Sequence, residues 1–258
     1  MRALLAAALV PTMAGAAAEP VAPVAPAPRP YLEAGALDPV AILPPPPKPG
    51  SPAQGADAAA YAVTRDLAGS PHWHLAIADV PSGVPRLLDD FSCAAGRRLE
   101  PARQPALALL LARARRDVVA VVRDAKAHFA RPRPHLGNAA ALCVARTDAL
   151  GRSFAYPSGH ATEGWTFGLV LAALMPERAT ALLRRARVYG ESRIVCGVHW
   201  ASDVEAGRLA GSALFATLVG DPAFRADLER ARAELAGPAD APDPATCAAE
   251  EGAASPVP

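Results

Sequence analysis

The sequence of 258 residues predicts an all-α protein, built as a single-domain helical bundle. Two observations favour this fold class. Apolar residues recur at three-, four- and seven-residue steps, which places them on one face of a helix. In contrast, few segments alternate apolar and polar residues as a half-buried strand would. We see no internal repeat, and a chain of this length can form one large domain.

The first 55 residues predict a leader and an arm that precede the bundle. Residues 1–18 contain Arg2, an apolar run and small residues at the end, a pattern typical of a cleaved export signal peptide. The alternative is an ordinary buried helix, which the proline-rich segment behind it disfavours. Residues 19–55 are dense in proline, which favours extended polyproline geometry. We therefore expect a proline-rich N-terminal arm that lies on a surface.

Residues 56–236 hold the predicted helical domain. Short helices, separated by Gly, Pro and Ser, are expected at 57–68, 72–78 and 84–95. The strongest helix spans 102–130, and Pro132 ends it because a residue before proline is pushed out of helical geometry. The buried stripe of this helix consists of Leu107, Leu111, Val118, Val122, Ala125 and Phe129.

Further helices follow the longest one, and their expected ranges are 160–174, 177–189, 198–219 and 222–235. The first of these is strongly apolar and ends near Pro176, and the second is basic. Residues 237–258 are expected to form a flexible C-terminal tail.

Charge and hydropathy exclude two classes of partner. The sequence holds 26 basic and 25 acidic residues, so it lacks the excess of positive charge that nucleic-acid binding requires. After the leader, no stretch reaches the roughly 18 uninterrupted apolar residues of a bilayer-spanning helix. We expect no nucleic-acid partner, no membrane anchor and a soluble mature protein.

The four cysteines indicate disulfide bonds. An exported protein can form them, and an even number suits two bonds. Of the three possible connectivities we favour Cys93–Cys143 with Cys196–Cys247, and free buried thiols are the alternative. No two cysteines have the spacing of a metal motif, so no metal site is expected.

One pair of residues in the 198–219 helix is suited to nucleophilic catalysis. His199 and Asp203 are four residues apart, so on a helix they share one face. The carboxylate can accept the Nδ1 proton, which leaves Nε2 free as a nucleophile. Taken alone, such a pair is more often a capped or salt-bridged surface turn.

Residues 157–160 read Pro-Ser-Gly-His where a loop enters the 160–174 helix. The free N–H groups and the dipole at a helix start favour an anion, and Gly159 allows close approach of the backbone. His160 is suited to protonating a leaving alkoxide. Ser158 can equally serve as a simple N-cap.

Three basic residues add positive charge, namely Lys126, Arg133 and Arg193. Arginine presents a planar fork of donors that suits phosphoryl oxygens, and lysine adds a compact charge. Phosphoryl transfer depends mainly on positioning and charge stabilisation, so several cations are expected around a phosphate. Each residue alone could be a solvated surface charge, and the joint spacing is what indicates a phosphate site.

These motifs resemble the signature of the type 2 phosphatidic acid phosphatase and vanadium haloperoxidase superfamily. The matching positions are Lys126 with Arg133-Pro134, residues 157–160, and Ser192-Arg193 with His199 and Asp203. The segments LPPPPKPGS, ARPRP, YPSGHATEGW and GESRIVCGVHWASDVEAGR are similar to the bacterial class A non-specific acid phosphatases. The likeness runs over residues 31–235, nearly the whole mature chain.

The resemblance implies a periplasmic or secreted acid phosphatase that hydrolyses many phosphate monoesters through a phosphohistidine intermediate, without a metal or other cofactor. It implies His199 as the nucleophile, Asp203 as its orienting partner, and His160 as the acid and then the base. The groups expected to hold the phosphoryl oxygens are Lys126, Arg133, Ser158, Arg193 and the Gly159 amide. Relatives often have threonine at the position of Ala161 and an aromatic residue at that of His135, and these departures could alter the pocket rim and the substrate preference.

Three other functions fit parts of the pattern. A vanadate-dependent haloperoxidase shares the superfamily, but this chain is short for that group. A lipid phosphatase of the superfamily would have transmembrane helices, although a soluble enzyme could accept short-chain lipid phosphates. A non-catalytic phosphate-binding protein would not need both histidines and Asp203. We also expect a homo-oligomer, and phosphoryl transfer to alcohols as a side activity.

Overall fold

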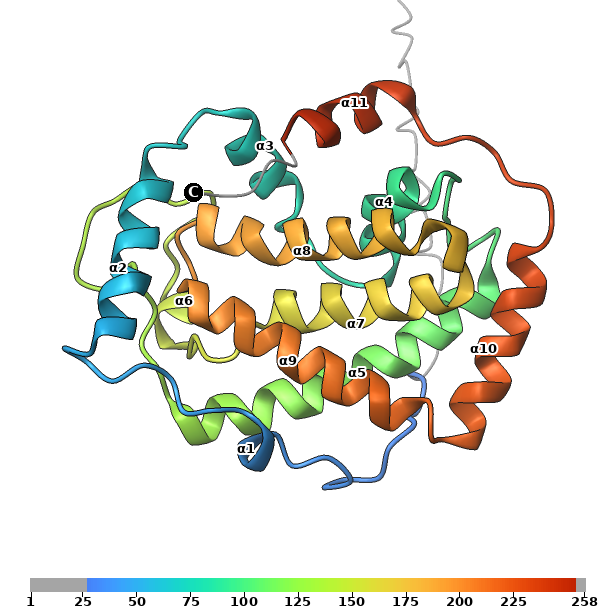
Figure 1. The fold of residues 1–258 in the computed structure, drawn as a ribbon, viewed down its shortest axis with the longest axis horizontal. Coiled ribbons are helices and arrows are strands. Elements are labelled where there is room, and N and C mark those ends of the chain that lie inside the picture. Colours follow the sequence, from blue (N-terminus) through green and yellow to red (C-terminus); the bar gives the residue numbers. More distant parts are fainter. Residues whose placement is uncertain (1–26, 254–258) are drawn as a thin grey trace, which may run out of the picture.

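The structure is a computed structural model, and it describes residues 27–253. Within these residues the chain forms eleven α-helices and one short 3-10 helix, and no strand (Figure 1). The predicted all-α bundle is therefore confirmed. The predicted signal peptide at 1–18 lies outside the described residues. None of the described helices combines the length and the apolar character that crossing a bilayer demands.

Every predicted helix is present, with changes at the ends, and three short helices were not predicted. In chain order the helices are α1 (Pro39–Ile42), α2 (Pro52–Arg65), α3 (Pro71–Ala78), α4 (Val84–Ala95), α5 (Pro105–Phe129), α6 (Asp148–Arg152), α7 (Gly159–Leu174), the 3-10 helix η1 (Pro176–Arg178), α8 (Ala179–Val195), α9 (Ala201–Leu218), α10 (Pro222–Leu235) and α11 (Pro244–Gly252). The unpredicted helices are α1, α6 and α11.

Helix α7 lies at the centre of the bundle, between α8, α9 and α5 (Figure 1). It is buried on nearly all sides, as its apolar sequence predicts. Helix α9 approaches it closely because Gly207 faces the start of α7. A Cβ atom on Gly207 would lie 2.8 Å from the Ser158 carbonyl oxygen, so a larger residue would push the two helices apart. This close approach brings the beginnings of α7 and α9 together.

Several helices begin where a capping side chain precedes proline. Ser51 accepts a hydrogen bond from the Gln54 amide at the start of α2, and Ser70, Asp221 and Asp243 act in the same way for α3, α10 and α11. Proline suits the first helical position because its missing N–H has no partner there. The Ser51-Pro52 pair therefore starts α2 earlier than the predicted residue 57.

The described part of the proline-rich segment, residues 27–51, packs against α5 and α10. Tyr31 is buried and donates its amide to Asp117 of α5 (3.0 Å) and its hydroxyl to Asp227 of α10 (2.6 Å). Farther along, the Pro44 carbonyl accepts a hydrogen bond from the Tyr156 hydroxyl (2.6 Å). These contacts hold the segment on the bundle although most of it has no regular structure.

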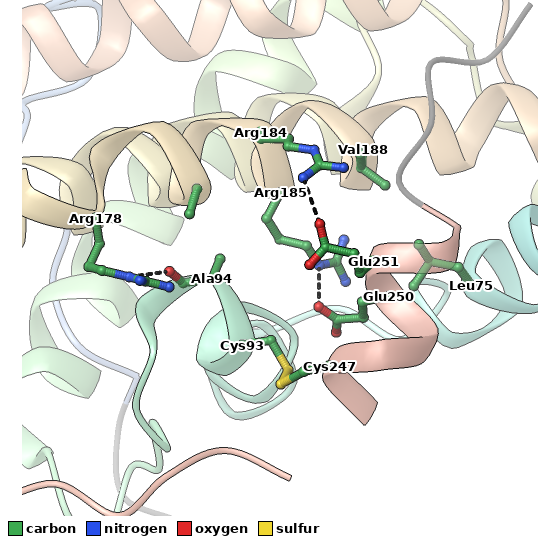
Figure 2. Close-up of a pocket in the computed structure, with 11 residues that line it drawn as sticks. Leu75, Cys93, Ala94, Arg178, Arg184, Arg185, Val188, Cys247, Glu250 and Glu251 are labelled. Atoms are coloured by element: carbon green, nitrogen blue, oxygen red, sulfur yellow. Dashed lines mark hydrogen bonds and ion pairs between the residues drawn. A yellow bond between two sulfur atoms is a disulfide. The ribbon is translucent and has the colours of Figure 1, made fainter. Parts of the chain in front are cut away.

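The C-terminal segment differs from the flexible tail that we expected, because residues 244–252 form α11. This helix lies over α3, α4 and α8 and borders a pocket with them (Figure 2). Cys247 of α11 is bonded to Cys93 of α4, and Glu250 pairs with Arg185 of α8 at 3.5 Å. The described part of the segment is thus fastened to the bundle by a covalent bond and by ion pairs, which include Glu251 with Arg184 at 3.2 Å.

Both predicted disulfide pairings are wrong, since the structure joins Cys93 to Cys247 and Cys143 to Cys196. Helix α11 folds back over the bundle and brings Cys247 to the last turn of α4. The loop between α5 and α7 passes the C-terminal end of α8, which brings Cys143 to Cys196. Cysteine spacing in the sequence cannot reveal either return of the chain.

Candidate active site

The predicted site residues come together where α5 and α8 end and where α7 and α9 begin. Ala130 ends α5 in a left-handed conformation, with φ of 46°, and the chain then turns so that Arg133 faces the start of α9. At the end of α8, Gly197 has φ of 74°, a conformation that glycine adopts easily. Arg65 donates to the carbonyls of Ile194 and Val195 and so satisfies the last turn of α8.

His199 lies in the loop between α8 and α9, not on a helix face as predicted. Its Nδ1 atom is 3.3 Å from Oδ2 of Asp203, so the predicted pair does form. The contact does not arise from a shared helix face, which was the predicted reason. Asp203 is the third residue of α9, and its Oδ2 atom caps the helix by accepting from the Trp200 amide at 2.8 Å. The residue that precedes this cap therefore meets the same carboxylate.

The other ring nitrogen of His199 faces Arg133. Nη1 of Arg133 is 3.1 Å from Nε2 of His199 and also donates to the Val198 carbonyl at 2.8 Å. A guanidinium group can only donate, so Nε2 is the unprotonated acceptor. The proton of a neutral ring then sits on Nδ1, next to Asp203. This is the tautomer that nucleophilic attack from Nε2 requires.

Burial and nearby cations keep the His199 ring neutral. The side chain is almost fully buried, and burial lowers its pKa well below the usual value. The charges of Arg133, Lys126, Arg193 and His160 lower this pKa further. These four groups are the cations and the second imidazole that the motifs predicted. They act on one ring because they surround it.

Burial also lowers the pKa values of the other two cations, Lys126 and Arg193. Burial first, and Arg133 second, lower the pKa of Lys126 to about 7, and its Nζ atom donates to the Phe154 carbonyl. Arg193 is 5% exposed, and its Nε atom has no hydrogen-bond partner among the described residues. Buried positive charge with unused donors is the environment that an anion would relieve.

Ser158 and Gly159 open α7 next to this cluster. Ser158 caps the helix, because its hydroxyl accepts from the Ala161 amide at 3.4 Å, so the simple N-cap reading is correct as far as it goes. The Ser158 amide donates to the Asp203 carbonyl at 2.9 Å. The first turn of α7 is thereby fixed beside the start of α9, and Gly159 contributes an amide at the helix start.

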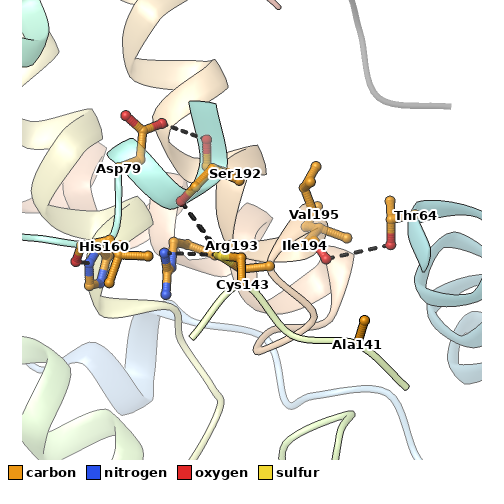
Figure 3. The surroundings of a disulfide bond; sticks show 12 residues. Thr64, Asp79, Ala141, Cys143, His160, Ser192, Arg193, Ile194 and Val195 are labelled. Carbon is orange, nitrogen blue, oxygen red and sulfur yellow. Dashed lines mark hydrogen bonds between the residues drawn. A yellow bond between two sulfur atoms is a disulfide. The ribbon is translucent and has the colours of Figure 1, made fainter. Parts of the chain in front are cut away.

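His160 faces the cluster from α7, and Figure 3 shows it near Arg193 and the Cys143–Cys196 disulfide. Its Nε2 atom is 3.0 Å from the Val80 carbonyl, and its ring stacks on Tyr189. Burial first, and Arg193 second, lower its pKa to about 3. The predicted role of general acid requires a proton on this ring, and the negative charge of a bound phosphate would raise its pKa.

The two departures from the resemblance occupy different environments. Ala161 is 1% exposed and packs with Ile194 and Val204, so it belongs to the core and not to a pocket rim. His135 is 4% exposed, and its Nδ1 atom has no hydrogen-bond partner within the described part of the chain. Burial lowers the pKa of His135, and Arg133 lowers it further.

Sequence reasoning missed two groups that hold the site. Arg131 donates to Asp203 (2.6 Å) and to Asp57 of α2 (2.7 Å), and the repeated Arg-Pro in the segment ARPRP was the available signal. On the other side, Asp79 accepts from Ser192 at 2.5 Å, as Figure 3 shows. Ser192, the first residue of the third motif, therefore joins α8 to the end of α3 and does not face His199.

Comparison with known proteins agrees with this geometry. Residues 105–225, which include every motif residue, match the PAP2 superfamily. An acid phosphatase of Zymomonas mobilis is 42% identical over 194 residues, which cover 74% of each chain. A non-specific acid phosphatase of Salmonella typhimurium is 37% identical over 182 residues, covering 68% of this chain and 71% of the relative. A non-specific acid phosphatase of Providencia stuartii is 40% identical over 115 residues, covering 44% and 46%.

The helical bundle, with two histidines and several cations at one end, is therefore that of the PAP2 superfamily, to which the chain belongs. Within this superfamily its relatives place it with the bacterial acid phosphatases.

Proposed function

We propose that this protein is an exported acid phosphatase that hydrolyses a broad range of phosphate monoesters through a phosphohistidine on His199. The observation that carries the proposal is the contact between Arg133 and Nε2 of His199, because it leaves an unprotonated nitrogen beside a cation. The names of the relatives support the acid phosphatase activity. Two disulfides and the signal-like residues 1–18 support export.

In the first half of the proposed reaction, Nε2 of His199 attacks phosphorus and the ester P–O bond breaks. His160 gives its proton to the leaving alkoxide, so the product is an alcohol. Asp203 stabilises the positive ring that forms, since its carboxylate faces Nδ1. The oxygens of the transferred group would be held by Lys126, Arg133, Arg193, Ser158 and the Gly159 amide.

In the second half, His160 removes a proton from water, and the water oxygen attacks phosphorus. The N–P bond breaks, which releases inorganic phosphate and returns His199 to its neutral form. An alcohol in place of water would yield a new phosphate ester, and this is the proposed side activity. No step calls on a metal, because the chain supplies the positive charge from Lys126, Arg133 and Arg193.

An acidic optimum follows from the charge of Lys126. With a pKa of about 7, this lysine is charged below neutral pH and loses its charge above it. A dianionic substrate needs that charge, so binding should weaken as the pH rises through 7.

The proposal can be tested by trapping the intermediate. Purified protein is mixed with a phosphate monoester labelled on phosphorus and quenched in alkali, in which phosphohistidine survives. Label should remain on the wild type and be absent from His199→Ala, and EDTA should leave turnover unchanged. Inhibition by EDTA that zinc reverses, or turnover by His199→Ala, would contradict the mechanism. Light scattering of the same sample tests the expected homo-oligomer.

A further inference from the structure

Arg131 is a buried arginine between two buried carboxylates. Its Nη1 atom donates to Oδ1 of Asp203 at 2.6 Å, and its Nη2 atom donates to Oδ2 of Asp57 at 2.7 Å. The Arg131 side chain is 6% exposed, and the two carboxylates are 0% and 4% exposed. Buried charges persist only when they are paired and hydrogen-bonded, so these three side chains form one unit.

The two oxygens of Asp203 have separate tasks. Oδ2 faces Nδ1 of His199 and the Trp200 amide, whereas Oδ1 is held by Arg131. A carboxylate that is fixed at one oxygen cannot rotate freely about its side chain. With Oδ1 held by Arg131 and Oδ2 by the Trp200 amide, the carboxylate keeps one orientation, and Oδ2 in turn orients the His199 ring.

Arg131 is itself fixed by further contacts. Nη1 also donates to the Ser202 hydroxyl at 2.7 Å, and Nη2 also donates to Gln54 at 2.7 Å. Asp57 accepts from the Ser202 amide at 2.9 Å, so it binds both Arg131 and the first turn of α9. These contacts join α2, the end of α5 and the start of α9, and none of them goes to the groups proposed to hold the phosphoryl oxygens.

We propose that Arg131, itself held in place by Asp57, is a positioning residue that keeps the Asp203 carboxylate charged and turned toward His199. The proposal rests on the proposed function, in which His199 is the nucleophile. Arg131 acts through Asp203 and does not contact the substrate.

The charges of Arg131 and Asp57 act on the His199–Asp203 pair in opposite directions. Burial raises the pKa of Asp203 to about 6, Arg131 opposes this rise, and Asp57 adds to it. The titratable groups that face the pair from every neighbouring element are Asp57 of α2, Lys126 of α5, Arg131 and Arg133 after α5, Tyr156 before α7, His160 of α7 and Arg193 of α8. Of these, Arg131 forms an ion pair with Asp203, and Asp57 forms an ion pair with Arg131.

The experiment compares Arg131→Met and Asp57→Asn by the pH dependence of kcat/KM for p-nitrophenyl phosphate. We expect Arg131→Met to lower kcat by about 10- to 100-fold with KM nearly unchanged, the size of effect that misplacing a reacting group causes. Its acid limb should move to higher pH, because a lost cation makes the pair easier to protonate. The limb of Asp57→Asn should move to lower pH, because a lost anion has the opposite effect.

Three further variants complete the test. Arg131→Lys keeps the positive charge, so the acid limb of its pH profile should lie close to that of the wild type. Arg131→Met combined with Asp203→Asn should be no slower than Asp203→Asn alone, because both changes remove one function. Arg123→Met, an exposed position on the same helix as Lys126, is the matched control and should behave as the wild type.

Shifts of the acid limb in the same direction for Arg131→Met and Asp57→Asn, or no shift in either, would overturn the proposal. If Arg131→Met does not fold, Arg131→Lys and Asp57→Asn retain hydrogen bonding and carry the comparison. Should the wild type lack phosphatase activity, the proposed function fails, and ¹⁵N chemical shifts of the His199 ring then decide the positioning role. That role predicts a changed ¹⁵N shift at Nδ1 in Arg131→Met, because the contact between Nδ1 and Asp203 is altered, and an unchanged Nδ1 shift contradicts it.

Discussion

Nη1 of Arg133 lies 3.1 Å from Nε2 of His199, so the nitrogen that we expect to attack phosphorus is in contact with a cation before any substrate arrives. The contact disfavours protonation of the ring, since a second proton on Nε2 would face the guanidinium. In the proposed reaction, this contact would have to be released as Nε2 approaches phosphorus. Arg133 then becomes available for the phosphoryl oxygens.

Replacement of Arg133 tests both tasks at once. Arg133→Ala should lower kcat/KM for p-nitrophenyl phosphate by about 10²- to 10³-fold, the range found when one donor to a transition-state oxyanion is removed. The acid limb should also move to higher pH, because Arg133 is the largest charge effect that lowers the pKa of His199. Arg152→Ala removes an arginine that is 76% exposed and serves as the control. Equal loss in both variants would contradict the assigned role.

Lys126 should set the alkaline limb of activity. Its pKa of about 7 means that it is charged below this pH and neutral above it, so kcat/KM should fall as the pH rises through 7. Lys126→Arg keeps its charge and should move this limb to higher pH. Lys48→Arg, an exposed change in the proline-rich segment, should leave the profile unchanged. The same substrate is used for all three proteins, so its own ionisation cancels, and an unmoved limb in Lys126→Arg would contradict the assignment.

Asp90 should make the protein less stable as the pH rises. Burial, opposed by Arg185 and Arg86, raises its pKa from 3.8 to about 7. The folded state thus binds this proton more tightly than the unfolded state, and the free energy of unfolding falls between about pH 4 and pH 7. Asp90→Asn should remove on the order of 1–3 kcal/mol of that fall, measured by urea unfolding across this range. Asp89→Asn, with a side chain 68% exposed, should leave the fall in place.

The two disulfides should differ in what they support. Replacing Cys93 and Cys247 with Ser opens a link across 154 residues and should lower the free energy of unfolding by about 2–5 kcal/mol. Activity at low temperature should persist, because α11 lies away from His199. Replacing Cys143 and Cys196 should lower both stability and kcat, since the Cys196 sulfur is 3.6 Å from Arg193. Thermal melts and turnover of the two double variants check this, and equal loss of turnover would contradict it.

Local patterns predicted most of the fold. Sequence patterns placed α4 and α10 to the residue and α7 within one residue, whereas the predicted range of α5 began at 102, before its start at Pro105. The end of α8 was placed at residue 189, six residues before Val195. The sequence did not reveal that Arg65 of α2 donates to the last carbonyls of α8, and this tertiary contact lets the helix continue to Val195. Helix α11 was missed for a similar reason, because its short sequence is held by Cys93 and Arg185.

The sequence predicted that the site residues lie together, but it did not predict the residues that hold them in place. The charges of Lys126, Arg133, Arg193 and His160 all act on His199. Their spacing indicated a common site because the motifs stand at helix ends. Arg131, Asp57 and Asp79 act through contacts between residues more than 70 positions apart in the chain. No spacing rule connects such residues, so only the folded structure assigns them.

The hydrogen bond from the Ser158 amide to the Asp203 carbonyl runs from main chain to main chain. Replacing the side chain of Ser158 or Asp203 leaves the donor and the acceptor of this bond in place, with proline at position 158 as the exception. Side chains around the site can therefore vary while the segments bearing His160 and His199 keep their spacing. Substitutions that change the substrate preference can therefore accumulate without moving the two histidines apart.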